Sequence, residues 1–105
     1  MITQDILSRA TKQLVKKFHP QRIILFGSHA RGVADEHSDV DFLVVASFKG
    51  KRRSVLVEMD RALRGMGFAR DIVLLTPEEF ERDRQIPGTI ARPAAQEGKI
   101  LYERT

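Results

Sequence analysis

Two short apolar segments, each with polar residues at one end, constrain the fold of this chain most strongly. Residues 22–26 end directly before Gly27 and Ser28, and residues 39–46 open with Asp39 and Asp41. Short apolar runs bounded by turn residues are typical of buried strands. The pattern therefore predicts a tight glycine turn after one strand and a pair of carboxylates at the start of the next.

The two carboxylates are unusual for a strand. Each residue of a strand rises roughly 3.3 Å and side chains alternate between faces, so Asp39 and Asp41 should project from one side, roughly 7 Å apart. At an effective dielectric near 20 they would repel by roughly 2–3 kcal/mol. A divalent cation between them would reverse the sign of that interaction. Since Mg²⁺ prefers carboxylate and phosphate oxygens, the pair favours a metal–nucleotide complex.

The Gly-Ser pair suits a phosphate. Gly27 permits a tight turn and a close backbone approach, and we expect Ser28 to cap a short helix. Helix N-termini expose unpaired N–H groups and the positive end of the helix dipole. Arg31, one turn into that helix, could meet triphosphate oxygens, and an ion pair with Asp35 or Glu36 is the alternative.

A third carboxylate opens another apolar run. Asp71 precedes residues 72–75, which are bounded by turn residues and rich in β-branched side chains. If this strand lies beside residues 39–45, about 4.8 Å away, Asp71 can join the other two aspartates. Three carboxylates could hold two ions at the ~3.5–4 Å spacing used in phosphoryl chemistry. The alternative for Asp71 is a surface ion pair with Arg70 or Arg31.

These motifs resemble a known family. Gly27-Ser28-His29-Ala30-Arg31-Gly32 followed by Ser38-Asp39-Val40-Asp41-Phe42-Leu43-Val44 is similar to the nucleotidyltransferase superfamily that includes DNA polymerase beta. Within it, the segments resemble the minimal nucleotidyltransferases, the antitoxin partners of HEPN toxins, and the resemblance covers nearly the whole chain. It implies an α/β (α+β) nucleotidyltransferase fold, a small mixed β-sheet with helices packed on it.

The resemblance also implies an activity. The chain would move AMP from ATP to a hydroxyl acceptor, a tyrosine of a cognate HEPN ribonuclease toxin, and would act as an antitoxin. Mg²⁺, as two ions, would be the cofactor. The implied catalytic and metal-binding residues are Asp39, Asp41 and Asp71, and the implied nucleotide-binding residues are Gly27, Ser28 and Arg31. Asp71 would share the second ion and help to deprotonate the hydroxyl.

Two other functions remain open. A binding-only antitoxin would occlude its toxin without chemistry. A small-molecule nucleotidyltransferase of the aminoglycoside-modifying kind would need a partner subunit to complete its acceptor site. A nucleic-acid-binding module is disfavoured because it leaves three aspartates unexplained, and the basic run of residues 49–53 has no interleaved aromatic platform.

Length, charge and composition limit the number of domains and the kinds of partner. At 105 residues we expect one domain over residues 1–105, and a net charge of +4 favours anionic ligands or partners. The longest apolar runs fall far short of the ~18 residues that a membrane span requires. The chain has no cysteine, which fits a cytoplasmic location. A homo- or hetero-oligomer is compatible with the chain.

The remaining elements follow from periodicity and from proline positions. Apolar residues from Ile6 to Phe18 recur at helical spacing after a Thr3 cap, and a second such set covers residues 55–63. Residues 77–79 are typical of a first helical turn, and another helix should begin near Pro93. Residues 100–103 should add an edge strand. We expect His29 to have a structural or solvent-facing role.

Overall fold

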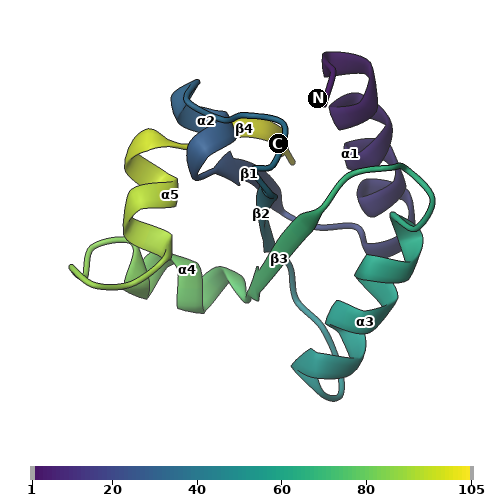
Figure 1. The fold of residues 1–105 in the computed structure, drawn as a ribbon. Helices are drawn as coiled ribbons and strands as arrows, with labels where there is room; N and C mark the ends of the chain where they lie inside the picture. The colour runs from purple at the N-terminus through teal and green to yellow at the C-terminus, as the bar shows by residue number, and fades with distance from the viewer. Residues whose placement is uncertain (1, 105) are drawn as a thin grey trace.

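The computed structural model describes residues 2–104. In chain order the elements are α1 (Gln4–Phe18), β1 (Arg22–Phe26), α2 (Ser28–Arg31), β2 (Val40–Val45), α3 (Arg52–Ala62), β3 (Arg70–Leu75), α4 (Pro77–Asp83), α5 (Ala91–Glu97) and β4 (Lys99–Glu103). Figure 1 shows these elements around one central sheet. No helix within residues 2–104 is long and apolar enough to cross a membrane.

The four strands form a mixed sheet in the order β3-β2-β1-β4. β1 pairs antiparallel with both β2 and β4, whereas β2 and β3 run parallel. The parallel pair needs a long crossover, which α3 provides between β2 and β3. The mixed sheet and the edge position of β4 confirm the predicted α+β fold.

Helices cover both faces of the sheet, as Figure 1 shows. On β2, Phe42 and Val44 belong to the same core as α1 and α3, while Leu43 and Val45 belong to a second core with α4 and α5. Because successive strand residues point to opposite faces, a central strand covered on both sides must be apolar throughout. This explains the uninterrupted apolar run that begins at Phe42.

Helix boundaries follow capping rules. The Ile6 N–H donates to Thr3 Oγ1 at 3.2 Å, and α1 ends where His19 takes a left-handed conformation just before Pro20. α5 begins at Ala91, two residues earlier than the predicted start near Pro93. Pro93 therefore lies in the first helical turn, where a missing backbone N–H costs no helical hydrogen bond.

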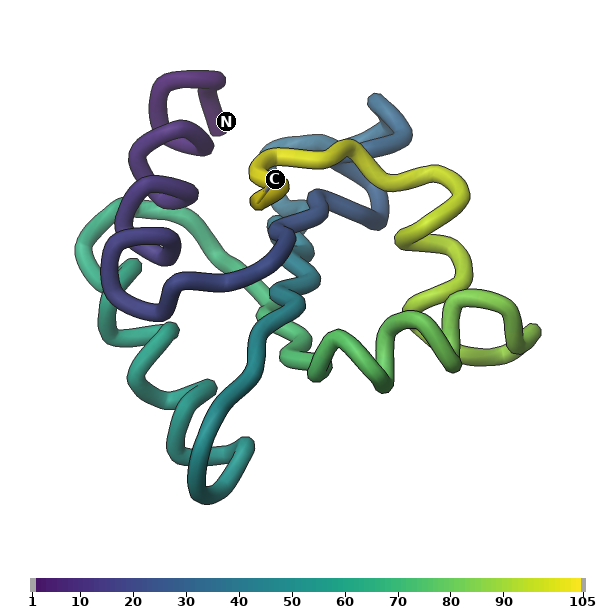
Figure 2. The backbone as a smooth tube through the Cα atoms, turned by 180° about the vertical axis from the view of Figure 1, so that it is seen from behind, coloured from purple at the N-terminus to yellow at the C-terminus, as the bar shows by residue number. Residues whose placement is uncertain are grey.

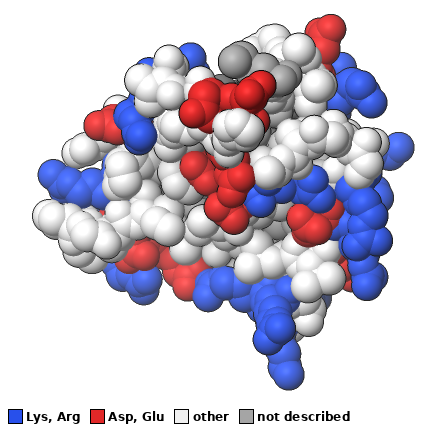
Figure 3. Space-filling model, in the orientation of Figure 1, with Lys and Arg blue, Asp and Glu red and all other residues white. Residues whose placement is uncertain are grey.

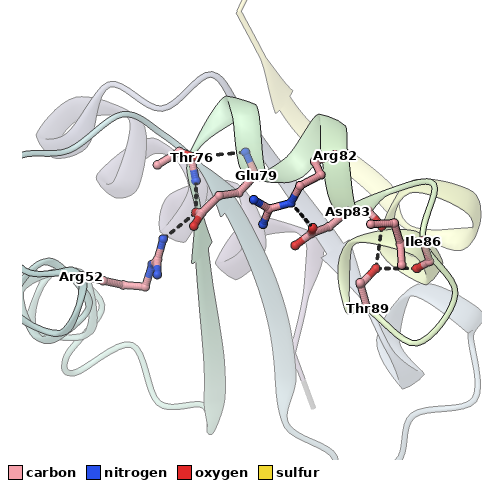
Figure 4. Close-up of polar contacts among 7 residues, drawn as sticks. All are labelled: Arg52, Thr76, Glu79, Arg82, Asp83, Ile86 and Thr89. Atoms are coloured by element: carbon pink, nitrogen blue, oxygen red, sulfur yellow. Dashed lines mark hydrogen bonds and ion pairs between the residues drawn. The ribbon is translucent and has the colours of Figure 1, made fainter.

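α4 begins with a capping box, shown in Figure 4. The Glu79 N–H donates to Thr76 Oγ1 at 3.1 Å, and the Thr76 N–H donates to Glu79 Oε1 at 2.9 Å. Arg52 at the start of α3 donates to the same Glu79 oxygen at 2.5 Å. The Glu79 carboxylate thus links the start of α3 to the start of α4, just after the last residue of β3.

α5 and β1 pack closely because the residue that ends α5 is a glycine. A Cβ at Gly98 would collide with the Ala94 carbonyl oxygen and lie 3.0 Å from the Leu25 carbonyl oxygen. The chain can therefore turn directly from α5 into β4 while Gly98 lies against Ile24 and Leu25 of β1. This turn places β4 on the free edge of the sheet.

Candidate active site

Strand register brings two of the predicted carboxylates together. Asp41 on β2 is the register partner of Asp71 on β3, and on its other side it faces Phe26, the last residue of β1. Adjacent strands lie about 4.8 Å apart, so Asp41 and Asp71 are immediate neighbours at one end of the sheet. The predicted alignment of these two strands is confirmed.

Asp39 lies just outside the strand on which we expected it. β2 begins at Val40, whose N–H donates to the Ala69 carbonyl at 2.9 Å and so forms the first bond to the β3 side. Asp39 precedes this bond and is exposed. The predicted strand start at residue 39 is therefore wrong by one residue, although Asp39 still adjoins the strand end that carries Asp41.

Gly27 packs directly against the central carboxylate. Its φ of 76° lies in the region that favours glycine, and a Cβ there would collide with Asp41 Oδ2 and lie 3.2 Å from Asp41 Cγ. Any side chain at this position would thus displace the carboxylate as well as strain the turn. Glycine is required here for two independent physical reasons.

The prediction that Ser28 caps the short helix is wrong. Gly27 occupies the N-cap position, Ser28 is the first residue of α2, and no side chain makes a capping hydrogen bond. The N–H groups of Ala30 and Arg31 both donate to the Gly27 carbonyl at 3.1 Å. The positive φ of Gly27 turns the chain one residue earlier than expected, so the Ser28 hydroxyl is not used as a cap.

The loop between α2 and β2 is held by its own side chains. Asp35 Oδ1 accepts hydrogen bonds from the His37 N–H at 2.8 Å and from Ser38 Oγ at 3.2 Å. The His29 ring, protonated at Nε2, donates to the Ser38 carbonyl at 3.3 Å. Sequence reasoning missed this turn, although Asp at its first position and Ser three residues later is a recognisable local signal. The contacts hold the residue that immediately precedes Asp39.

The electrostatic field at the site favours a cation. Burial raises the pKa of Asp41 above its ordinary value, and the negative charges of Asp71 and Asp39 raise it further. The charges of His29 and Arg31 act in the opposite direction. Both neighbouring aspartates therefore lie close enough to act on Asp41. Figure 3 shows acidic side chains gathered in the middle of this face, with most basic side chains around them.

The neighbouring arginines leave Asp71 available. Arg70 lies 3.1 Å from Asp60 Oδ1 through Nε, and its other nitrogens donate to the carbonyls of Asp60 and Phe68. The Nε contact is an ion contact without hydrogen-bond geometry. Within residues 2–104 neither Arg70 nor Arg31 forms an ion pair with Asp71. The surface-pair alternative for Asp71 thus finds no support in the described part of the chain.

The donor set fits a magnesium ion that also takes substrate oxygens. Within residues 2–104, no three His, Cys, Asp or Glu side chains converge tightly enough to enclose an ion by themselves. Mg²⁺ is usually bound by one or two carboxylates together with substrate phosphates and water. The adjacent pair Asp41 and Asp71, with Asp39 beside them, matches that incomplete protein shell.

The fold and this arrangement define a class of protein. The family model of the nucleotidyltransferase domain matches residues 5–101, so the chain belongs to this family. Its fold is that of nucleotidyltransferases, which confirms the superfamily resemblance seen in the sequence.

Two curated relatives come from Methanocaldococcus jannaschii. "Putative protein adenylyltransferase MJ1305" is 52% identical over 72 residues, covering 67% of this chain and 43% of the relative. "Putative protein adenylyltransferase MJ0604" is 32% identical over 82 residues, covering 78% of each chain. The chain thus spans less than half of the first relative and most of the second.

Two solved structures share the fold. One is described as "Crystal structure of the toxin-antitoxin with AMP-PNP" and superimposes with a TM-score of 0.70 at 21% identity, covering 94% of this chain and 74% of that chain. The other is described as a putative nucleotidyltransferase from Sulfolobus solfataricus, with a TM-score of 0.64 at 22% identity and coverage of 95% and 79%. At these low sequence identities, the two structures show only that the fold is shared.

Proposed function

We propose that this chain is a protein adenylyltransferase that moves AMP from ATP to a hydroxyl of another protein, a tyrosine of a HEPN toxin, and thereby acts as an antitoxin. The observation that carries the proposal is the contact between the Gly27 turn and Asp41, with Asp71 as the register partner of Asp41. The names of the two archaeal relatives and the toxin-antitoxin fold neighbour support the same activity.

In the proposed reaction the turn binds the phosphates and the aspartates bind the metal ion. The Gly27–Ser28 turn holds the β- and γ-phosphates, and Arg31 contributes a positive charge beside them. Asp39, Asp41 and Asp71 are the residues that would hold Mg²⁺, which when bound neutralises the phosphate charge. These assignments place the triphosphate over the end of the sheet where β2 begins.

The transfer itself exchanges one phosphorus–oxygen bond for another. The acceptor hydroxyl oxygen bonds to the α-phosphorus, the bond from that phosphorus to the β-phosphate bridging oxygen breaks, and pyrophosphate leaves in line. Asp71 lies on β3, the edge strand next to β2, and accepts the hydroxyl proton. Burial, and then the negative charges of Asp71 and Asp39, raise the pKa of Asp41, so a cation beside it would favour its charged form.

The proposal is tested with radiolabelled ATP, Mg²⁺ and a purified HEPN toxin. We expect covalent label from the α-phosphate of ATP on the toxin, none from the γ-phosphate, and loss of at least 100-fold in rate for Asp41→Asn or Asp71→Asn. Asp83→Asn on α4 is the matched control, because Asp83 pairs with Arg82 away from this strand end. A toxin neutralised without any label would instead establish occlusion.

A further inference from the structure

A hollow lies on the α1 side of the sheet, opposite the core that α4 and α5 form. It is a groove of about 420 Å³ between α1 and β4, with side walls of Leu7, Thr11, Val15, Leu101 and Tyr102. Figure 2 shows α1 standing beside the C-terminal strand in this region. None of these residues belongs to the nucleotide site, so the groove needs a separate explanation.

The walls of the groove are apolar because of one irregularity in β4. Ile23 pairs with Tyr102 while Ile24 pairs with Ile100, so Leu101 is an extra, bulged residue. As a result Leu101 and Tyr102, although consecutive, both pack toward the α1 core. Opposite them, Thr11 donates its hydroxyl to the Leu7 carbonyl at 2.8 Å, so this polar atom needs no partner in the groove.

The rim of the groove is basic. Lys12 and Lys16 are exposed, lie one helical turn apart on α1 and line the groove. The groove-lining residues described here include no acidic side chain. An apolar floor with a positive rim complements a partner whose apolar stripe is flanked by carboxylates.

The shape selects a helix as that partner rather than a strand. β4 is an edge strand of only five residues, it starts with Lys99, and it is bulged at Leu101. Short length, an initial lysine and a bulge are the features by which proteins block strand addition at an edge. The α1 wall from Gln4 to Lys16 is about 18 Å long, which matches about three turns of a helix.

Neighbouring hollows extend from the groove to residues that adjoin the nucleotide site in sequence. A neighbouring hollow of about 310 Å³ shares Leu7 and Leu101 with the groove and reaches His29, and a further hollow of about 350 Å³ extends from His29 to Ser38. His29 lies on α2, directly after the Gly27–Ser28 turn, and its charge acts on Asp41. A protein bound in the groove would therefore approach the end of the sheet that carries the carboxylates from its α1 side.

We infer that the groove between α1 and β4 is the docking site of the protein acceptor, which binds through an acidic amphipathic helix. That the bound protein is the acceptor of AMP rests on the proposed function, whereas the binding of an acidic helix in the groove does not. The nucleotide site supplies the chemistry, and the groove determines which protein is presented to it.

The test uses a synthetic 14-residue amphipathic helix with a leucine stripe flanked by glutamates, and a twin peptide with lysines in place of the glutamates. Amide NMR shifts of the native chain should move at Thr11, Leu101 and Tyr102 with the acidic peptide. Lys12→Glu combined with Lys16→Glu should weaken binding of the acidic peptide at least tenfold. The same double variant should bind the lysine peptide, which the native chain should not bind.

Arg9→Glu combined with Lys17→Glu is the matched control, since it changes the net charge equally on α1 outside the groove. Equal binding of the acidic peptide by both double variants, or shifts confined to other elements, would overturn the inference. Calorimetric binding of ATP with Mg²⁺ is measured in parallel. If the native chain binds ATP with Mg²⁺ but does not bind the acidic peptide, only the docking site is refuted, while the reverse result in the native chain would refute only the proposed function.

Discussion

At the residue scale, Gly27 combines a positive backbone φ with a direct contact to Asp41. Gly27→Ala adds a Cβ at φ 76° that also collides with Asp41 Oδ2. We expect a loss of about 1–3 kcal/mol in unfolding free energy together with loss of ATP binding, measured by urea unfolding and calorimetry. Gly88→Ala is the matched control, because its φ is 92° but no atom lies within 4 Å of the added Cβ. It should lose stability only. Intact ATP binding in Gly27→Ala would contradict the role given to the turn.

Asp41 should make the metal-free chain sensitive to pH. The folded chain holds the Asp41 proton more tightly than the unfolded chain, whose pKa is near the ordinary 3.8. This contribution to stability is therefore present below pH ~3.8 and is lost as the pH rises through the higher folded pKa. Asp41→Asn cannot ionise, so it should melt at a higher temperature than the native chain at pH 7 without Mg²⁺.

Calorimetric melting between pH 7 and pH 4 checks this expectation, and the advantage of Asp41→Asn should shrink toward acid. A constant difference across that range would show that the pKa of Asp41 is not raised in the folded chain.

At the element scale, the start of α4 depends on Thr76. Thr76→Ala removes the hydroxyl that accepts from the Glu79 N–H and should cost about 1 kcal/mol in unfolding free energy, measured by urea unfolding. Thr76→Ser keeps the hydroxyl and should stay close to the native value. An equal loss in both variants would assign the effect to packing of the Thr76 methyl group rather than to the cap.

The elements themselves could largely be predicted from local patterns. The apolar runs fixed β1, β2 and β3 to within one residue, and the Thr3 cap and the periodic residues up to Phe18 bounded α1. The failures have local causes too. Ser28 was expected as a cap because the sequence does not state that Gly27 takes a φ of 76° and itself occupies the N-cap position.

At the scale of the whole molecule, the decisive facts depend on register, which no local pattern contains. The sequence predicted that Asp71 would join Asp41 only if the two strands were neighbours. That outcome requires α3 to cross over and the Val40 N–H to reach the Ala69 carbonyl. The groove beside α1 could not be predicted either, because it depends on the single bulged residue Leu101.

The covering of both sheet faces also explains why the carboxylates lie at the end of the sheet. The two cores take alternate residues of β2, and Asp41 occupies a position on the α4 and α5 side, two residues before Leu43. It lies at the strand end, where β1 has already turned away at Gly27. The end of the sheet therefore presents the Asp41 carboxylate next to Asp71 and against the Gly27 turn.

The most direct test of the central claim is a calorimetric titration of ATP into the native chain, Asp41→Asn and Asp71→Asn, each with and without Mg²⁺. The account predicts that the native chain binds ATP only with Mg²⁺ and that both variants lose this metal-dependent binding while remaining folded. ATP binding that is equal with and without Mg²⁺, or unchanged in both variants, would contradict it.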